Sequence, residues 1–222
     1  MNADTILYHG VDGLDVTFQG ALAARARSRL ASARAAAEEE RGAVSLELGG
    51  LVVHVQPSGW PGGYRYVVWT GDDGEYIGIA ENGDDERWNI RVSVQARAFL
   101  VHGFGRVRDR LYERLEALGA TVRQESIARI DYAVDLDWPG FALDPGAFVA
   151  HSRTSIGEHS KLDVTDGAVA WRGRRVESVT LGTMPGRQVI AYDKRAEAVQ
   201  KYKWEWFDVW GLDRQTRKEP VW

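Results

Sequence analysis

The sequence contains no cysteine among its 222 residues. Disulfide bonds and thiolate metal sites are therefore excluded, and a reducing, cytoplasmic environment is expected. Long apolar runs are lacking too. The sequence has no stretch of 18 apolar residues that could form a membrane span, and we expect no membrane partner. The first eight residues have neither the basic start nor the apolar core of a signal peptide.

Several common catalytic motifs are also missing. There is no Walker A loop, no dinucleotide-binding glycine fingerprint and no Gly-x-Ser-x-Gly motif. The five histidines show neither the HExxH spacing nor a His-x-His pair. A nucleotide-binding loop, a serine nucleophile elbow and a histidine-based metal site are therefore not indicated.

The chain as a whole lacks an excess of positive charge, but one part of it has such an excess. The net charge is −4, from 28 basic and 32 acidic residues, which argues weakly against a protein that binds nucleic acid along its whole surface. Seven acidic and no basic residues lie between Asp72 and Glu86, whereas Trp171 to Lys203 holds eight basic and three acidic residues. The second stretch, with a local net charge of +5, can attract phosphates; a solvated surface without a ligand is the alternative.

The hydrophobic patterns predict one α+β domain over residues 1–222, with a mainly antiparallel central sheet and flanking helices. Strands are expected at Leu14–Gln19, Val44–Leu48, Leu51–Gln56, Tyr64–Thr70, Glu75–Ile79, Trp88–Gln95, Ser126–Leu136, Val169–Arg172, Val176–Leu181 and Gln188–Asp193. Helices are expected at Ala21–Arg41 (ended by Gly42), at Phe104–Leu118 (ended by Gly119), from Asp144-Pro145 toward Arg153, and at Lys194–Trp210. Residues 155–167 are polar and predict a loop.

The segment from Ala128 to Asp137 is the first candidate for chemistry. Strand alternation places Ile130, Tyr132, Val134 and Leu136 on one face, which we expect to be the core face, and Arg129, Asp131, Ala133, Asp135 and Asp137 on the other. Carboxylate oxygens suit Mg²⁺ or Mn²⁺, so a divalent-cation site is one interpretation. Two aspartates four residues apart lie about 13 Å apart along a strand, so partners from elsewhere would be needed. A solvent-facing strand salt-bridged to Arg129 is the alternative.

The segment from Val176 to Lys194 is the second candidate. It predicts a hairpin with its turn at residues 183–186, and alternation puts Ile190, Tyr192 and Lys194 on one face. A tyrosine beside a lysine in a basic region can act as a nucleophile toward phosphate if a base, a metal or nearby cations lower its pKa. A strand tyrosine that packs its ring in the core is the alternative.

The order of four motifs resembles the replication initiation factor family of rolling-circle plasmids and filamentous phages, the Rep_trans type. The motifs are GLDVTF (Gly13 to Phe18), WNIRVSVQARAFLVHG (Trp88 to Gly103), ARIDYAVDL (Ala128 to Leu136) and VTLGTMPGRQVIAYDKRAE (Val179 to Glu197). The resemblance implies a Rep nuclease-like fold in a bacterial cytoplasm. It also implies an enzyme that nicks one strand of origin DNA, single-stranded or in a hairpin, through a 5′-phosphotyrosine and a free 3′-OH.

The resemblance assigns roles to individual residues. Tyr192 would be the nucleophile, with Tyr202 and Tyr132 next in line, and Lys194 would hold the scissile phosphate or the phenolate. Asp131 would bind Mg²⁺ or Mn²⁺, with Asp135 and Glu177 as further candidates for the metal shell. The residues expected to contact the DNA are Arg172, Arg174, Arg175, Arg187 and Arg195. A host helicase and a second copy of the chain are further implied partners.

Two departures from the family pattern and two other functions remain open. The chain has Gly182-Thr183 where the family has Gly-Ser, and it ends at Val221-Trp222 where the family continues with an Arg-x-Glu strand, so we expect a C-terminal truncation. A non-catalytic DNA-binding regulator on the same fold is the first alternative. A carbohydrate- or ligand-binding module is the second, because nine tryptophans are present and Trp204, Trp206 and Trp210 cluster. Strand alternation would expose these three rings, whereas helical packing would bury them.

Overall fold

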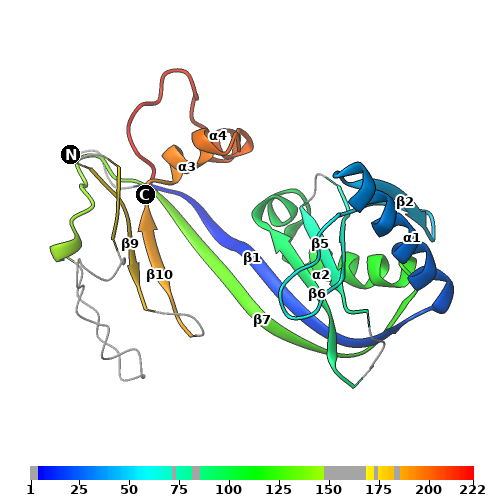
Figure 1. The fold of residues 1–222 in the computed structure, drawn as a ribbon. Helices are drawn as coiled ribbons and strands as arrows, with labels where there is room; N and C mark the ends of the chain where they lie inside the picture. The colour runs from blue at the N-terminus through cyan, green and yellow to red at the C-terminus, as the bar shows by residue number, and fades with distance from the viewer. Residues whose placement is uncertain (1–4, 72–73, 82–85, 148–168, 173–174, 183–185) are drawn as a thin grey trace. The chain divides into compact units, whose positions relative to one another are not determined.

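The computed structural model describes residues 5–71, 74–81, 86–147, 169–172, 175–182 and 186–222 (Figure 1). The strands are β1 (Thr5–Leu22), β2 (Val44–Leu48), β3 (Leu51–Val55), β4 (Tyr66–Trp69), β5 (Glu75–Ile79), β6 (Trp88–Gln95), β7 (Ala120–Asp137), β8 (Val169–Arg172), β9 (Arg175–Leu181) and β10 (Val189–Tyr192). The helices are α1 (Ala24–Glu40), α2 (Ala96–Ala117), α3 (Lys194–Gln200) and α4 (Glu205–Trp210), with a 3-10 turn, η1, at Pro145–Ala147.

Over these described ranges, the strands form a seven-stranded antiparallel sheet in the order β2-β3-β4-β5-β6-β1-β7 and a three-stranded sheet in the order β10-β9-β8. The predicted α+β class with a mainly antiparallel sheet is therefore confirmed. The chain divides into two compact units: unit 1 comprises Met1–His9 and Val134–Trp222, and unit 2 comprises Gly10–Ala133. The expectation of one domain over the whole chain stays a prediction. No helix in the described ranges is both long enough and apolar enough to cross a bilayer.

The strands of unit 2 follow the sequence patterns closely. The β2–β3 hairpin turns at Gly49 and Gly50, whose φ angles of 55° and 80° are accessible to glycine at little cost. Ile77, Val92 and Val16 lie side by side on β5, β6 and β1 and are buried on one face of the sheet. Alternation of apolar residues was the signal for β1 and β6, and the structure confirms both strands.

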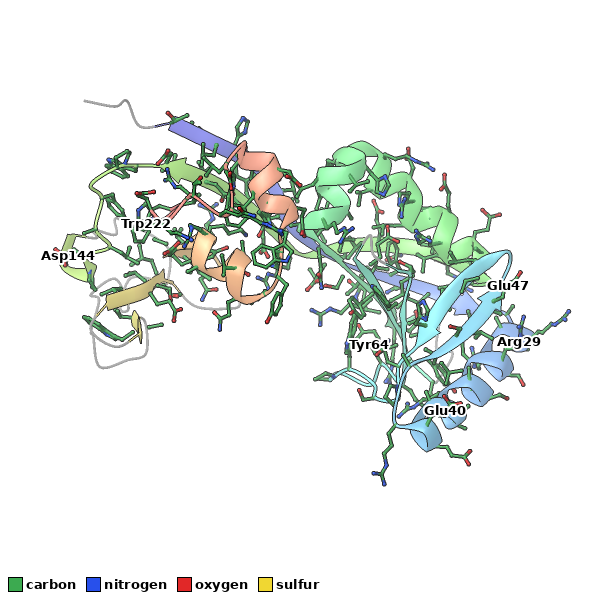
Figure 2. All side chains as sticks on the ribbon, turned by 90° about the horizontal axis from the view of Figure 1, so that it is seen from above. Arg29, Glu40, Glu47, Tyr64, Asp144 and Trp222 are labelled. Carbon is green, nitrogen blue, oxygen red and sulfur yellow. The ribbon has the colours of Figure 1, made fainter. Side chains whose placement is uncertain are left out.

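Helices α1 and α2 contribute the other side of this core. Helix α1 buries a stripe of small and apolar residues (Ala26, Leu30, Ala33 and Ala37), while its exposed side carries charged residues such as Arg29 and Glu40 (Figure 2). Helix α2 buries the predicted stripe of Val107, Leu111 and Leu115, but it begins earlier than expected and has a kink at Gly103, where φ is 73°.

The end of α1 differs from the prediction by one residue. Arg41, rather than Gly42, takes the left-handed conformation, with a φ of 55°. The N–H of Gly42 then donates to the carbonyl of Ala37 at 3.1 Å, which satisfies one of the free carbonyls at the helix end. Gly42 therefore correctly predicted where the helix ends, but the residue in the left-handed conformation is its neighbour, Arg41.

A buried ion pair fastens α2 to the sheet. The carboxylate of Glu75 on β5 is fully buried; Arg110 of α2 donates its Nε–H to it at 3.2 Å, and Arg114 of α2 forms an ion pair with it. Both guanidinium groups are mostly buried as well, with side chains 13% and 16% exposed. A charge at such depth is stable because it is paired.

The faces of β7 were predicted wrongly. Ile130, Tyr132 and Val134 were expected to face a core, but they are 53%, 64% and 47% exposed. Strand β7 is the last strand in the order of the seven-stranded sheet, and alternation in a sequence separates two faces without showing which one is covered. On the predicted polar face, Asp135 is only 3% exposed.

Unit 1 is built on the small sheet and the C-terminal segment. Leu143, Val169, Val176 and Val179 form its apolar cluster, and Trp222 packs against that cluster. Trp222 also exchanges two backbone hydrogen bonds with Leu136 of β7, at 2.6 and 3.0 Å. The predicted short helix is present as η1, where Asp144 accepts a hydrogen bond from the N–H of Gly146; residues 148–153 lie outside the described residues, as does the predicted loop at 155–167.

The single helix predicted over Lys194–Trp210 is two helices. Tyr202 adopts a φ of 56°, and the N–H of Lys203 returns to the carbonyl of Ala198 at 2.8 Å, which closes α3. Ala198 and Trp206, four residues before and after Tyr202, are buried, whereas Tyr202 is 76% exposed. The sequence contains no signal for this break, because the residue in the left-handed conformation is not a glycine.

Candidate functional site

The junction between β10 and α3 positions the two residues predicted to be catalytic. Tyr192 is the last residue of β10 and pairs with Ser178 of β9. Asp193 caps α3 by accepting a hydrogen bond from the N–H of Ala196 at 3.0 Å. Lys194, the first residue of α3, donates its backbone N–H to the carbonyl of Val221 at 2.7 Å. Strand pairing, the cap and this contact fix the backbone of the Tyr192–Lys194 segment.

The side chains of Tyr192 and Lys194 meet. The Nζ of Lys194 donates to the Oη of Tyr192 at 2.9 Å, and that hydroxyl donates to the Oε2 of Glu197 at 3.1 Å. The side chain of Lys194 is only 3% exposed, and its ammonium lies 4.6 Å from the centre of the Trp206 ring. The phenol hydroxyl therefore lies between a buried cation and a carboxylate.

Glu197 holds three lysines. Its Oε1 accepts from Lys201 at 2.9 Å and from Lys203 at 3.1 Å, and its Oε2 lies 3.5 Å from the Nζ of Lys194. Burial alone would raise the pKa of this carboxyl, but the hydrogen bond from Lys201 and the charges of Lys194 and Lys203 outweigh it and lower the pKa to about 2. Glu197 is therefore ionised at neutral pH, and three ammonium groups surround one negative charge.

This tyrosine–lysine–glutamate cluster can activate a phenol. A carboxylate that accepts the phenol hydrogen fixes the direction of the oxygen lone pairs, and an ammonium at hydrogen-bond distance stabilises a phenolate. The excess of positive charge also favours an anionic substrate. Sequence reasoning had counted Glu197 only as an acid within the basic stretch; its i+3 spacing from Lys194 and i−4 spacing from Lys201 were the signals that could have identified it.

The predicted DNA-contacting arginines are spread over unit 1. Arg187 is exposed just before β10, and Arg195 is half-buried and donates its Nε to the carbonyl of Arg217 at 3.0 Å. The backbones of Arg172 and Arg175 pair with each other across β8 and β9. Arg174, residues 183–185 of the turn predicted at 183–186, and the side chains of Arg172 and Arg175 lie outside the described residues.

The three predicted metal ligands belong to different surroundings. Asp131, in unit 2, accepts a hydrogen bond from the Nε of Arg129 at 2.7 Å, the contact expected of a salt-bridged strand. Asp135, in unit 1, is buried and accepts from the indole N–H of Trp210 at 2.8 Å. Glu177 lies at a β-bulge, because its neighbours Val176 and Ser178 pair with the consecutive residues Trp171 and Ala170.

In the part of the chain that the structure describes, no three side chains of histidine, cysteine, aspartate or glutamate gather closely enough to hold a metal ion. The requirement for Mg²⁺ or Mn²⁺ stays a prediction of the resemblance, and no chemical step below depends on it.

The tryptophans expected for a carbohydrate platform are largely covered. Trp206 and Trp210 lie on helix α4 and are 1% and 5% exposed, and their ring centres are 5.8 Å apart. Helical packing has thus buried these two rings, so they do not form an exposed platform.

No protein-family model matches the chain. No curated protein matches it either.

Proposed function

We propose that the protein is a rolling-circle replication initiator that nicks and rejoins one strand of origin DNA through Tyr192. The observation that carries this proposal is the Tyr192 hydroxyl, placed 2.9 Å from the Nζ of Lys194 and 3.1 Å from the Oε2 of Glu197. The order of sequence motifs supports the same activity. So does the excess of positive charge between residues 171 and 203, which suits a polyanionic substrate.

The proposed reaction is a transesterification. The Oη of Tyr192 attacks the phosphorus of a DNA phosphodiester, a P–Oη bond forms, and the bond from phosphorus to the 3′ oxygen breaks. The result is a 5′-phosphotyrosine and a 3′-OH, whose proton comes from water. Joining is the reverse reaction, in which a 3′-OH attacks the phosphotyrosine.

Lys194 and Glu197 take separate parts in this step. Lys194 stabilises the negative charge that develops on the Tyr192 oxygen, and its burial strengthens that interaction because water screens it less. Glu197 orients the phenol hydrogen. Because the pKa of Glu197 is about 2, its carboxylate is too weak a base to retain the proton, which passes on to water.

The test is formation of a covalent protein–DNA adduct by the full chain. A pool of labelled single-stranded oligonucleotides, randomised in the central segment, is incubated with protein in Mn²⁺ or in EDTA and separated under denaturing conditions. We expect an adduct with the unaltered chain and none with Tyr192→Phe, since the variant keeps the ring but lacks the attacking oxygen.

Comparator variants make the assignment specific. Tyr132→Phe and Tyr202→Phe remove the hydroxyls of the two next candidates. An adduct that survives Tyr192→Phe and disappears in one of these variants would move the nucleophile to that tyrosine. Salt-dependent DNA binding without any adduct would instead favour the non-catalytic regulator. The EDTA arm tests the predicted metal requirement.

A further inference from the structure

The turn between α3 and α4 presents an aromatic ring to solvent in a strained backbone. Tyr202 is 76% exposed, and its φ of 56° is uncommon for a residue with a large side chain. Its ring lies edge-on to Trp204, with centroids 6.0 Å apart, and the guanidinium of Arg214 lies over the Trp204 ring at 5.3 Å. An unfavourable backbone that holds a ring outward calls for a functional explanation.

One lysine precedes Tyr202 in the turn and another follows it. Lys201 and Lys203 are 59% and 34% exposed, and both ammonium groups are held by the Oε1 of Glu197. The same carboxylate accepts the Tyr192 hydroxyl through its Oε2. One residue, Glu197, therefore ties the turn to the hydroxyl that the proposed function uses.

An exposed ring in the same turn as two cations matches one nucleotide of a single strand. A free nucleobase offers a flat face that stacks on an aromatic ring, and the adjoining phosphates pair with ammonium groups. In a duplex the bases stack on one another and offer no such face to a side chain, so the geometry favours single-stranded over double-stranded DNA.

We propose that the turn from Lys201 to Trp204 binds one nucleotide of single-stranded DNA beside the phosphate that Tyr192 attacks. Tyr202 stacks on the base, and Lys201 and Lys203 contact the flanking phosphates. This inference rests on the proposed function for its position on the substrate. The binding of a single strand by the turn is measured separately from the reaction.

The test measures binding of fluorescein-labelled oligo(dT) to the full chain by anisotropy at low salt. We expect Tyr202→Ala to weaken binding about 5- to 150-fold, the range given by the loss of one stacked base. Tyr202→Phe keeps the ring and is expected to bind more tightly than Tyr202→Ala. Lys201→Gln is expected to reduce the slope of log K against log[salt] by about 0.7, the effect of one phosphate contact on a single strand.

Two further variants separate the effect of the Tyr202 ring on DNA binding from its effect on folding. Tyr202→Gly removes the ring and relieves the left-handed strain, so we expect it to lose affinity like Tyr202→Ala while its melting temperature rises. Trp88→Ala removes another exposed ring, 43% exposed, that lies two residues after the acidic stretch of residues 72–86, and we expect no loss of affinity from it.

The outcomes distinguish this inference from the proposed function. If oligo(dT) does not bind the unaltered chain, or if Tyr202→Ala and Tyr202→Gly bind as tightly as the unaltered chain, the inference is overturned. It is also overturned if a duplex competes as well as a single strand. If the Tyr202 variants lose affinity but the unaltered chain forms no covalent adduct, the nucleotide site stands and the nicking function fails.

Discussion

Replacing Glu197 by glutamine tests the charge balance of the tyrosine–lysine–glutamate cluster. The carboxylate lies within 3.5 Å of three ammonium groups, which lower its pKa from 4.5 to about 2. At about 1.4 kcal/mol for each pKa unit, this would correspond to about 3 kcal/mol of native-state stability. Because Lys201 is 59% exposed, solvent screening reduces the expected contribution to about 1–2 kcal/mol.

The sign of the pH dependence follows from the direction of the pKa shift. Glu197 binds a proton less readily in the native protein than in the unfolded chain. Its contribution is therefore fully present above about pH 5 and is lost as the pH falls toward 2. Glu197→Gln lacks this contribution at every pH, so the unaltered chain and the variant differ most at pH 7 and converge in acid.

Urea unfolding followed by tryptophan fluorescence measures this difference at pH 7 and at pH 3. We expect the variant to be less stable by about 1–2 kcal/mol at pH 7, with a clearly smaller difference at pH 3. Glu39→Gln, at an exposed position of α1, is the control and is expected to stay within about 0.5 kcal/mol of the unaltered chain. An equal difference at both pH values would refute the reasoning, because it would show that the carboxylate charge is not what stabilises the cluster.

Two buried carboxylates give further predictions. Glu75→Ala removes the fully buried anion that holds Arg110 and Arg114, so we expect a loss of about 3–5 kcal/mol in urea unfolding, and a loss below about 1 kcal/mol would contradict the pairing. Asp135→Ala leaves the indole N–H of Trp210 without that acceptor and is expected to cost about 1–3 kcal/mol. Asp135→Asn keeps an acceptor oxygen and is expected to cost less in the same measurement, so equal losses in the two variants would count against the hydrogen bond.

Local patterns were sufficient to predict most elements of unit 2. The Gly49-Gly50 turn and the apolar alternation of β6 depend on neighbouring residues only, so the sequence carries them directly. The faces of β7 could not be predicted in this way. Alternation separates Tyr132 from Asp135, but which of them is covered depends on elements far away in the sequence, such as Trp210.

Only part of the candidate site could be predicted, because some of its contacts are local in the sequence and others depend on how the chain turns. Tyr192 and Lys194 are two residues apart across the junction of β10 and α3, and their meeting follows from local geometry. The contact of Glu197 with Lys203 depends on the chain turning back after α3, and that turn depends on Tyr202 in a conformation usually left to glycine. No feature of the sequence marked that conformation.

The position of β1 in the sheet has a consequence for the order of folding. Strands β2 to β5 each pair with the strand that follows, whereas β1 lies between β6 and β7, both of which come much later in the chain (Figure 1). Gly20 and Asn89, joined by two hydrogen bonds, are 69 residues apart. During synthesis β1 is therefore made long before the two strands that pair with it. Pairing β1 with β6 and β7 is the folding step that closes the longest loops and has the largest entropy cost.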